Sequence, residues 1–167
     1  MATIGGQGQL HPESNRSQLI NIQSLFADIL SVLAMTYSDT QPRGTLRYRL
    51  LSASLRPSDS PLADPGTWGH EYVRHLAAEL GEEFSFREEG GLEETKDSDK
   101  ATDSTQVQLP GTIEDLRSLA KECATFLLNH NAEPDAVDLL EEMEIIDEIT
   151  GLVDDNTYGR VCQYMIR

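Results

Sequence analysis

The sequence predicts an all-α protein of antiparallel helical pairs, an α-solenoid-like slab of about five to six helices with a long acidic disordered insertion. Two observations lead to this fold class. Almost every apolar run has the three- and four-residue spacing of a helix, and β-branched residues are scattered rather than alternating. Short polar turns separate the runs, which is typical of antiparallel neighbours. We find no clean internal repeat, so a solenoid is preferred over a closed bundle without being required.

Residues 1–16 are predicted to be a disordered leader, because they are rich in Gly, Gln, Ser and Asn and lack an apolar period. Residues 17–167 are predicted to form the helical domain. Its first helix runs from Ser17 to about Tyr37, and it is apolar nearly all round, so we expect it to be buried between other helices. Its main apolar positions are Leu19, Ile22, Phe26, Ile29, Leu30 and Leu33.

The second helix is predicted over residues 45–54, after a turn rich in Ser, Asp, Pro and Gly. It carries the one basic patch of the sequence, which we expect to pair with carboxylates inside so acidic a chain. The arginines of this patch are Arg43, Arg47, Arg49 and Arg56. A proline-rich loop over residues 57–66 leads to the third helix.

The third helix is predicted over residues 68–80, where large apolar side chains recur every four residues and share one face. That face needs partner helices to cover it. Its members are Trp68, Tyr72, Leu76 and Leu80. The opposite face, which includes Glu71 and Glu79, is predicted to be solvated. A flexible acidic loop follows at about residues 86–111, and it is predicted to be a tolerated insertion between two helices.

Three more helices are predicted after this loop. Thr112 can cap the first, Pro134 suits the first turn of the second, and Asp154 can begin the last. The core positions predicted in them are Leu116, Leu127, Leu140 and Tyr158. The last helix reaches the end of the chain with an open apolar stripe. We therefore expect a truncated polypeptide or a stripe that something else covers.

The charge of the chain limits the classes of partner that it can bind. A formal net charge of −16 and a pI near 4.4 argue against nucleic acid and anionic membranes as partners. Residues 133–155 hold ten carboxylates and no basic residue, so they are the best candidate contact with a basic partner. The candidate contact residues are Glu133, Asp138, Glu141, Glu142, Glu144, Asp147 and Glu148. No window approaches the roughly 20 apolar residues of a membrane span, so we expect a soluble intracellular protein.

No catalytic, cofactor or metal site is predicted. His70 and His75 lie near Glu71 and resemble a zinc-protease helix, but they are five residues apart, and a metal-binding pair needs four. An enzyme that uses these groups and His130 stays open as a remote alternative. Cys123 and Cys162 are predicted to be core residues in a reducing compartment.

Five blocks of sequence, in the same order, resemble the N-terminal helical region of one protein family, the 26S proteasome non-ATPase regulatory subunit two family. The blocks are residues 26–39, 46–50, 69–77, 129–133 with 136–140, and 155–158 with 160–165. The resemblance implies a non-catalytic scaffold of the regulatory-particle base that supports ubiquitin-dependent degradation, in the cytoplasm and nucleus. It implies proteasomal ATPase-ring subunits and other base subunits as partners.

The same family carries a toroid of proteasome/cyclosome repeats that docks ubiquitin receptors. No residue here matches that toroid, so receptor docking is expected only on the missing toroid. The alternative interpretation is a free-standing acidic helical adaptor that binds a basic partner through residues 133–155.

Overall fold

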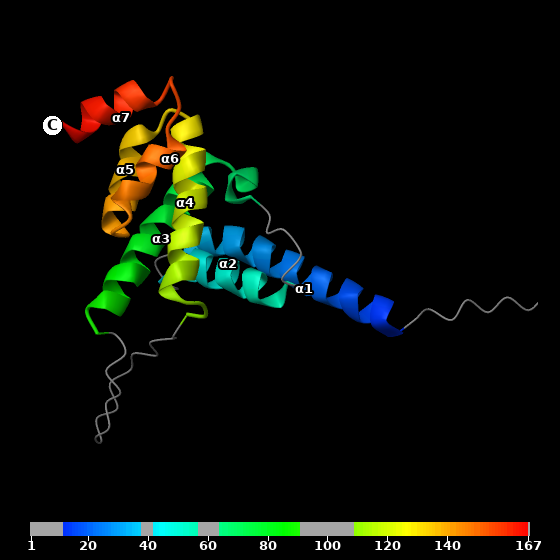
Figure 1. The fold of residues 1–167 in the computed structure, drawn as a ribbon. Helices are drawn as coiled ribbons and strands as arrows, with labels where there is room; N and C mark the ends of the chain where they lie inside the picture. The colour runs from blue at the N-terminus through cyan, green and yellow to red at the C-terminus, as the bar shows by residue number, and fades with distance from the viewer. Residues whose placement is uncertain (1–11, 38–41, 57–63, 91–108, 167) are drawn as a thin grey trace, which may run out of the picture.

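The structure is a computed structural model that describes residues 12–37, 42–56, 64–90 and 109–166. These residues form seven α-helices and three short 3-10 helices, and they contain no strand (Figure 1). The prediction of an all-α protein is confirmed. The elements in chain order are α1 (Pro12–Ala34), η1 (Met35–Tyr37), α2 (Gly44–Leu55), η2 (Pro65–Trp68), α3 (His70–Glu88), α4 (Ile113–Asn129), α5 (Glu133–Glu142), η3 (Ile146–Glu148), α6 (Ile149–Leu152) and α7 (Tyr158–Met165).

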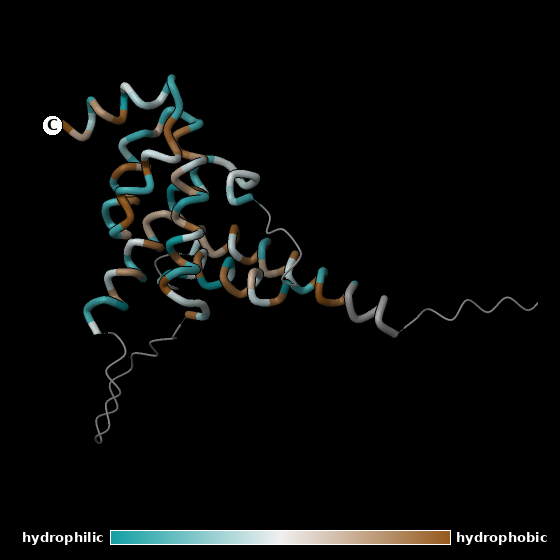
Figure 2. The backbone as a smooth tube through the Cα atoms, in the orientation of Figure 1, coloured by the Kyte–Doolittle hydropathy of each residue, from teal (hydrophilic) through white to brown (hydrophobic). Residues whose placement is uncertain are grey.

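The helices pack in pairs. Helix α1 lies along α2, while α3, α4 and α5 contact one another and α7 packs on α5. In Figure 1 the first turns of α1 project beyond the rest of the molecule, and α5 and α7 lie on the other side. Hydrophobic and hydrophilic residues are interspersed along α3, α4 and α5 (Figure 2), as expected of helices that bury one face. Six of the predicted core residues are fully or nearly fully buried: Tyr72, Leu76, Leu80, Leu116, Leu127 and Leu140.

Helix α1 differs from its prediction in two ways. It begins at Pro12, inside the predicted leader, since proline is well tolerated in a first helical turn. It is also inverted: small and polar side chains such as Ser24, Asp28 and Ser31 are buried, while the predicted core residue Phe26 is 60% exposed. The reason is that the buried face is hydrogen-bonded to α2. Ser24 Oγ lies 2.9 Å from Ser52 Oγ, and Ser31 Oγ donates to Thr45 O at 2.7 Å.

The prediction that Trp68 shares a helix face with Tyr72 is wrong. Gly69 has φ +92°, a left-handed conformation that separates η2 from α3, so Trp68 ends the 3-10 helix and is 37% exposed. Helix α3 also runs past its predicted end to Glu88, because Phe84 is buried in the core and extends the apolar face by another turn.

The C-terminal third holds two further corrections. The single helix predicted from Pro134 onward is broken after Glu142, where Glu144 adopts φ +55°, and η3 and α6 follow as separate elements. Tyr158, predicted in the core, is 60% exposed because the buried face of α7 consists of Val161. Most of the predicted acidic loop, residues 91–108, lies outside the described residues, as does the start of the predicted leader.

Candidate interaction surface

Within residues 133–155, predicted to contact a basic partner, exposed carboxylates gather on α5 and the turns after it. Helix α5 has a strong apolar face, with Ala136, Leu139 and Leu140 buried against α3 and α4, and this packing turns its carboxylates outward. Six of the seven predicted contact residues are exposed. We call them the acidic surface: Asp138, Glu141, Glu142, Glu144, Asp147 and Glu148.

Glu133 does not belong to this surface, although the sequence predicted it there. It is only 4% exposed, and its carboxylate accepts a hydrogen bond of 2.6 Å from Nε of Arg160 on α7. This pair attaches α7 to the start of α5. Because its charge is matched inside the molecule, Glu133 is a structural residue and is not available to a partner.

Part of the acidic surface is neutralised by neighbouring helices. Lys121 of α4 lies 3.6 Å from Glu148, and Arg117 lies 4.0 Å from Glu144. Tyr164 donates a hydrogen bond of 2.7 Å to Asp138. Within the described part of the chain, the remaining carboxylates have no basic group within 4.0 Å. They are Glu141, Glu142 and Asp147.

A groove of about 270 Å³ runs between α3 and α5 beside this surface. A Cβ atom at neighbouring Gly81 would overlap the carboxylate of Glu142, so this side chain of α5 lies against α3. Arg74 on one wall pairs with Asp135 on the other at 3.0 Å. The lining residues are Arg74, Ala77, Ala78, Asp135, Asp138, Leu139 and Glu142. Acidic side chains outnumber basic ones, so the groove suits a lysine or arginine side chain.

Two buried carboxylates of α3 hold the start of α2, an arrangement that the sequence did not reveal. Glu79, predicted on a solvated face, accepts hydrogen bonds from the backbone N–H groups of Leu46 at 2.7 Å and Thr45 at 3.4 Å. Glu83 pairs with Arg43 at 2.6 Å and Arg87 at 2.7 Å. Burial raises the pKa of Glu79 above the ordinary glutamate value. The one feature of the sequence that indicated buried carboxylates was the arginine patch, which was predicted to pair with carboxylates inside the molecule.

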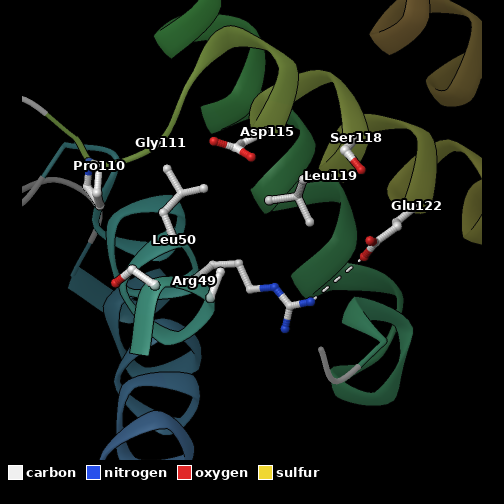
Figure 3. Close-up of a pocket in the computed structure, with 10 residues that line it drawn as sticks. Arg49, Leu50, Pro110, Gly111, Asp115, Ser118, Leu119 and Glu122 are labelled. Carbon is white, nitrogen blue, oxygen red and sulfur yellow. Dashed lines mark ion pairs between the residues drawn. The ribbon is translucent and has the colours of Figure 1, made fainter. Parts of the chain in front are cut away.

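Arg49, another member of that patch, lines a cavity of about 260 Å³ between α2 and α4. Arg49 of α2 and Glu122 of α4 point toward each other across it, 3.9 Å apart (Figure 3). Arg49 also lies 3.8 Å from the buried carboxylate of Asp28, which Arg56 contacts at 2.7 Å. Asp115, another lining residue, accepts the Thr112 N–H in a capping box. These groups serve packing and helix capping, so this cavity is structural.

The histidines considered for catalysis lie in different surroundings. His75 contacts Glu79 at 3.0 Å, whereas His130 stacks on Phe126 with ring centroids 3.8 Å apart. His70 lies beside the same phenylalanine, 6.1 Å between centroids. No group of three or more His, Cys, Asp or Glu residues could hold a metal ion in the part of the chain that the structure describes. The arrangement gives no support to the enzyme hypothesis.

The cysteines also differ from each other. Cys123 is fully buried, and burial raises the pKa of its thiol to about 12, which leaves it without thiolate character at neutral pH. Cys162 is only half-buried on α7, so the prediction that both are core residues holds for Cys123 alone. Both are free thiols.

One helix among the described residues is long and apolar enough to cross a membrane, judged by length and composition. It is the segment Gln18–Tyr37, and it corrects the prediction that no window comes close. The same test is passed by core helices of soluble proteins. The window is 28% buried in this structure, and its buried side, which includes Asp28, packs on α2.

Comparison with known proteins decides the family. The profile described as "RPN1 N-terminal domain" matches residues 9–167. The chain belongs to the RPN1 N-terminal domain family. The resemblance expected from the five sequence blocks is therefore confirmed.

Members of the RPN1 family from distant organisms show the same relationship. The 26S proteasome regulatory subunit RPN1 of Candida glabrata is 43% identical over 148 residues, which are 86% of this chain and 14% of that protein. Its Neurospora crassa counterpart is 44% identical over 144 residues, 86% of this chain and 13% of that protein. The 26S proteasome non-ATPase regulatory subunit 2 of Dictyostelium discoideum is 39% identical over 141 residues, 84% of this chain and 13% of its own length. This chain thus spans about 13–14% of the length of these curated relatives.

Proposed function

We propose that this chain acts as a non-catalytic scaffold segment of the proteasome regulatory-particle base and supports ubiquitin-dependent protein degradation through protein–protein contacts. The observation that carries the proposal is family membership over almost the whole chain, together with relatives that are named as regulatory and non-ATPase subunits. The geometry agrees with a scaffold, because the buried polar side chains Glu79, Glu83 and Asp28 join helices to one another.

The partners that we propose are the ATPase-ring subunits and other base subunits, in the cytoplasm and nucleus. The contact would use the acidic surface, because four of its carboxylates, Asp138, Glu141, Glu142 and Asp147, have no basic group within 4.0 Å among the described residues, and a side-chain-sized groove lies beside it. An exposed cluster of one sign gains most from a basic partner surface, which speeds encounter and fixes orientation. Ubiquitin-receptor docking is assigned to regions outside these 167 residues.

The proposal is tested by affinity purification of the tagged native protein in ATP-containing buffer, followed by mass spectrometry and a peptidase assay. We expect the ATPase subunits and peptidase activity to co-purify with the chain. Recovery of a basic partner without proteasome subunits would contradict the proposal and favour the acidic-adaptor alternative.

A charge-reversal variant tests the contact surface itself. Glu141→Lys, Glu142→Lys and Asp147→Lys together should reduce recovery of ATPase subunits by about 10-fold or more, since each reversed charge replaces attraction with repulsion. The matched control makes the same change in net charge at exposed carboxylates of α3: Glu71→Lys, Glu82→Lys and Glu88→Lys. Equal losses in both variants would show that net charge, and not this surface, controls assembly.

A further inference from the structure

The groove between α3 and α5 has two unlike walls. Arg74 of α3 contacts Asp135 of α5 at one end, and Gly81 meets Glu142 seven residues later on both helices. The two helices therefore run parallel and in register over about two turns, roughly 10 Å. Between these ends the wall from α3 offers only the methyl side chains of residues 77 and 78, so it leaves room beside α5.

The wall from α5 presents one carboxylate per helical turn. Asp135, Asp138 and Glu142 are spaced by three and four residues, so they share one face of α5. Within the described part of the chain, neither Asp138 nor Glu142 has a basic group within 4.0 Å. Asp138 accepts a hydrogen bond from the Tyr164 hydroxyl, and the Glu142 carboxylate lies against Gly81. Two of the three carboxylates can therefore each receive a cation from a partner.

The third carboxylate already holds a cation of this chain. Nη2 of Arg74 lies 3.0 Å from Oδ1 of Asp135, and the two side chains are 49% and 37% exposed. A surface ion pair of this kind contributes little to stability, so its exchange for another pair costs little. The guanidinium also repels any second cation that enters the same groove. Arg74 thus occupies the position that a basic side chain of a partner would take.

We propose that Arg74 is an internal competitor for this groove. An arginine of a partner helix replaces it on Asp135, and further basic side chains of that helix reach Asp138 and Glu142. A helix with arginines three and four residues apart presents them along one face, at the interval of the three carboxylates. Arginine suits this site because its planar guanidinium can donate two N–H groups to one carboxylate. The inference rests on the proposed function, since it takes the acidic surface as the contact with a basic partner.

A peptide titration tests the competition. The probe is an alanine-based helical peptide of about 20 residues whose arginines are spaced by three and four residues. Calorimetry measures its binding to the 167-residue chain at fixed ionic strength. We expect Arg74→Gln to bind the peptide about 10-fold more tightly than the native chain, because Asp135 becomes available and the competing charge is removed.

The matched control is Lys121→Gln. It makes the same change in net charge at another partly exposed cation, which lies 3.6 Å from Glu148 and does not line the groove. Its gain in affinity should stay below about 3-fold, because exposed charges at a distance are screened by salt. An Arg74→Gln chain that binds the peptide no more tightly than Lys121→Gln would overturn the proposal.

A double-mutant cycle separates competition from simple repulsion. In an Asp135→Asn background, Arg74→Gln changes the net charge by the same amount but frees no carboxylate. Its gain in affinity should therefore fall to that of the Lys121→Gln control. A gain that is equal in the two backgrounds would show that Arg74 acts only through its charge, and it would also overturn the proposal.

Circular dichroism verifies that each variant keeps its helices. If Arg74→Gln loses helix, Arg74→Met replaces it, with the same expected direction. The peptide titration is independent of the co-purification that tests the proposed function. Loss of the ATPase subunits from the purified material, with the gain of Arg74→Gln intact, would remove the proposed function and retain the competitor. Co-purification without that gain would remove the competitor alone.

Discussion

At the scale of single residues, Glu79 shows how one buried carboxylate can replace a missing local cap. Arg43, which precedes α2, has φ +57° and offers no side-chain cap to the helix. The N–H groups at the start of α2 are satisfied instead by Glu79 from α3, a residue 33 positions further along the chain from Leu46. Helix α2 is therefore held at its start by tertiary contact, and α3 is its cap.

Replacing Glu79 should expose this dependence. We expect Glu79→Ala to lower the free energy of unfolding by about 1–3 kcal/mol, because two buried N–H groups lose their acceptor. Glu79→Gln retains an amide oxygen that can accept from Leu46 and should cost less than half as much. Urea unfolding at neutral pH measures both. Equal losses would mean that the negative charge, and not the hydrogen bonds, holds α2.

The pH dependence of stability follows from the same residue. Burial raises the pKa of the Glu79 carboxyl. The carboxyl therefore stays protonated to a higher pH in the native state than in the unfolded chain. Its contribution to the free energy of unfolding therefore falls as the pH rises from the ordinary glutamate range through the raised pKa. The stability of the native chain relative to Glu79→Gln should decline over that window, measured by urea unfolding at successive pH values. A relative stability that increases with pH would contradict the direction of the shift.

At the scale of elements, α1 shows that a helix can be predicted correctly while its buried face is predicted wrongly. The apolar spacing gave the helix, and its large side chains suggested the core. The structure instead buries Ser24, Asp28 and Ser31, because α2 presents Ser52, Thr45 and Arg56 to them. The polar partners of α1 are more than a dozen residues away in sequence, so no local pattern could show the match.

A pair of neighbouring substitutions distinguishes the two faces of α1. Asp28→Ala should lower the free energy of unfolding by about 3–5 kcal/mol, because it removes the buried carboxylate that Arg49 and Arg56 both contact. Phe26→Ala should lower it by less than about 1 kcal/mol in dilute solution, since the ring is mostly exposed and a core position would cost several times more. Thermal or urea unfolding at low protein concentration measures both. A larger loss from Phe26→Ala would place this outward face of α1 in the core.

Sequence patterns for helix starts predicted the structure correctly where the contact involved joins residues close together in the sequence. Thr112 caps α4 in a capping box with Asp115, and Pro134 lies in the first turn of α5, as their positions in the sequence predicted. The break at Gly69 was missed. A four-residue spacing continues through it from Trp68 to Tyr72, and spacing does not report the backbone angle of one glycine.

At the scale of the whole molecule, six carboxylates of this chain of net charge −16 lie together and exposed on the acidic surface. The described basic groups lie mainly in internal pairs, such as Arg43 with Glu83 and Arg160 with Glu133. Arginines therefore join helices to one another, while many carboxylates lie exposed at the surface. Their mutual repulsion opposes the compact state and is screened by salt.

Salt should accordingly stabilise this protein. We expect the melting temperature to rise by a few degrees between about 0.02 and 0.5 M NaCl, because screening at the higher concentration shortens the reach of repulsion to a few ångströms. The variant Glu141→Lys with Asp147→Lys should melt higher than the native chain at low salt and show a weaker salt dependence. A melting temperature that falls with salt would mean that the surface ion pairs outweigh the repulsion.

The sequence alone determined the fold class, most helices, the acidic character of residues 133–148 and the family, because these follow from short-range periodicity, composition and ordered blocks of residues. Tertiary structure alone decided which side of α1 is buried. It also decided that Glu79 caps α2 and that Glu133 forms an ion pair with Arg160. The physical reason is that a buried polar group is stable only with its partner in place. Those partners come from distant parts of the chain, which packing brings together and spacing does not reveal.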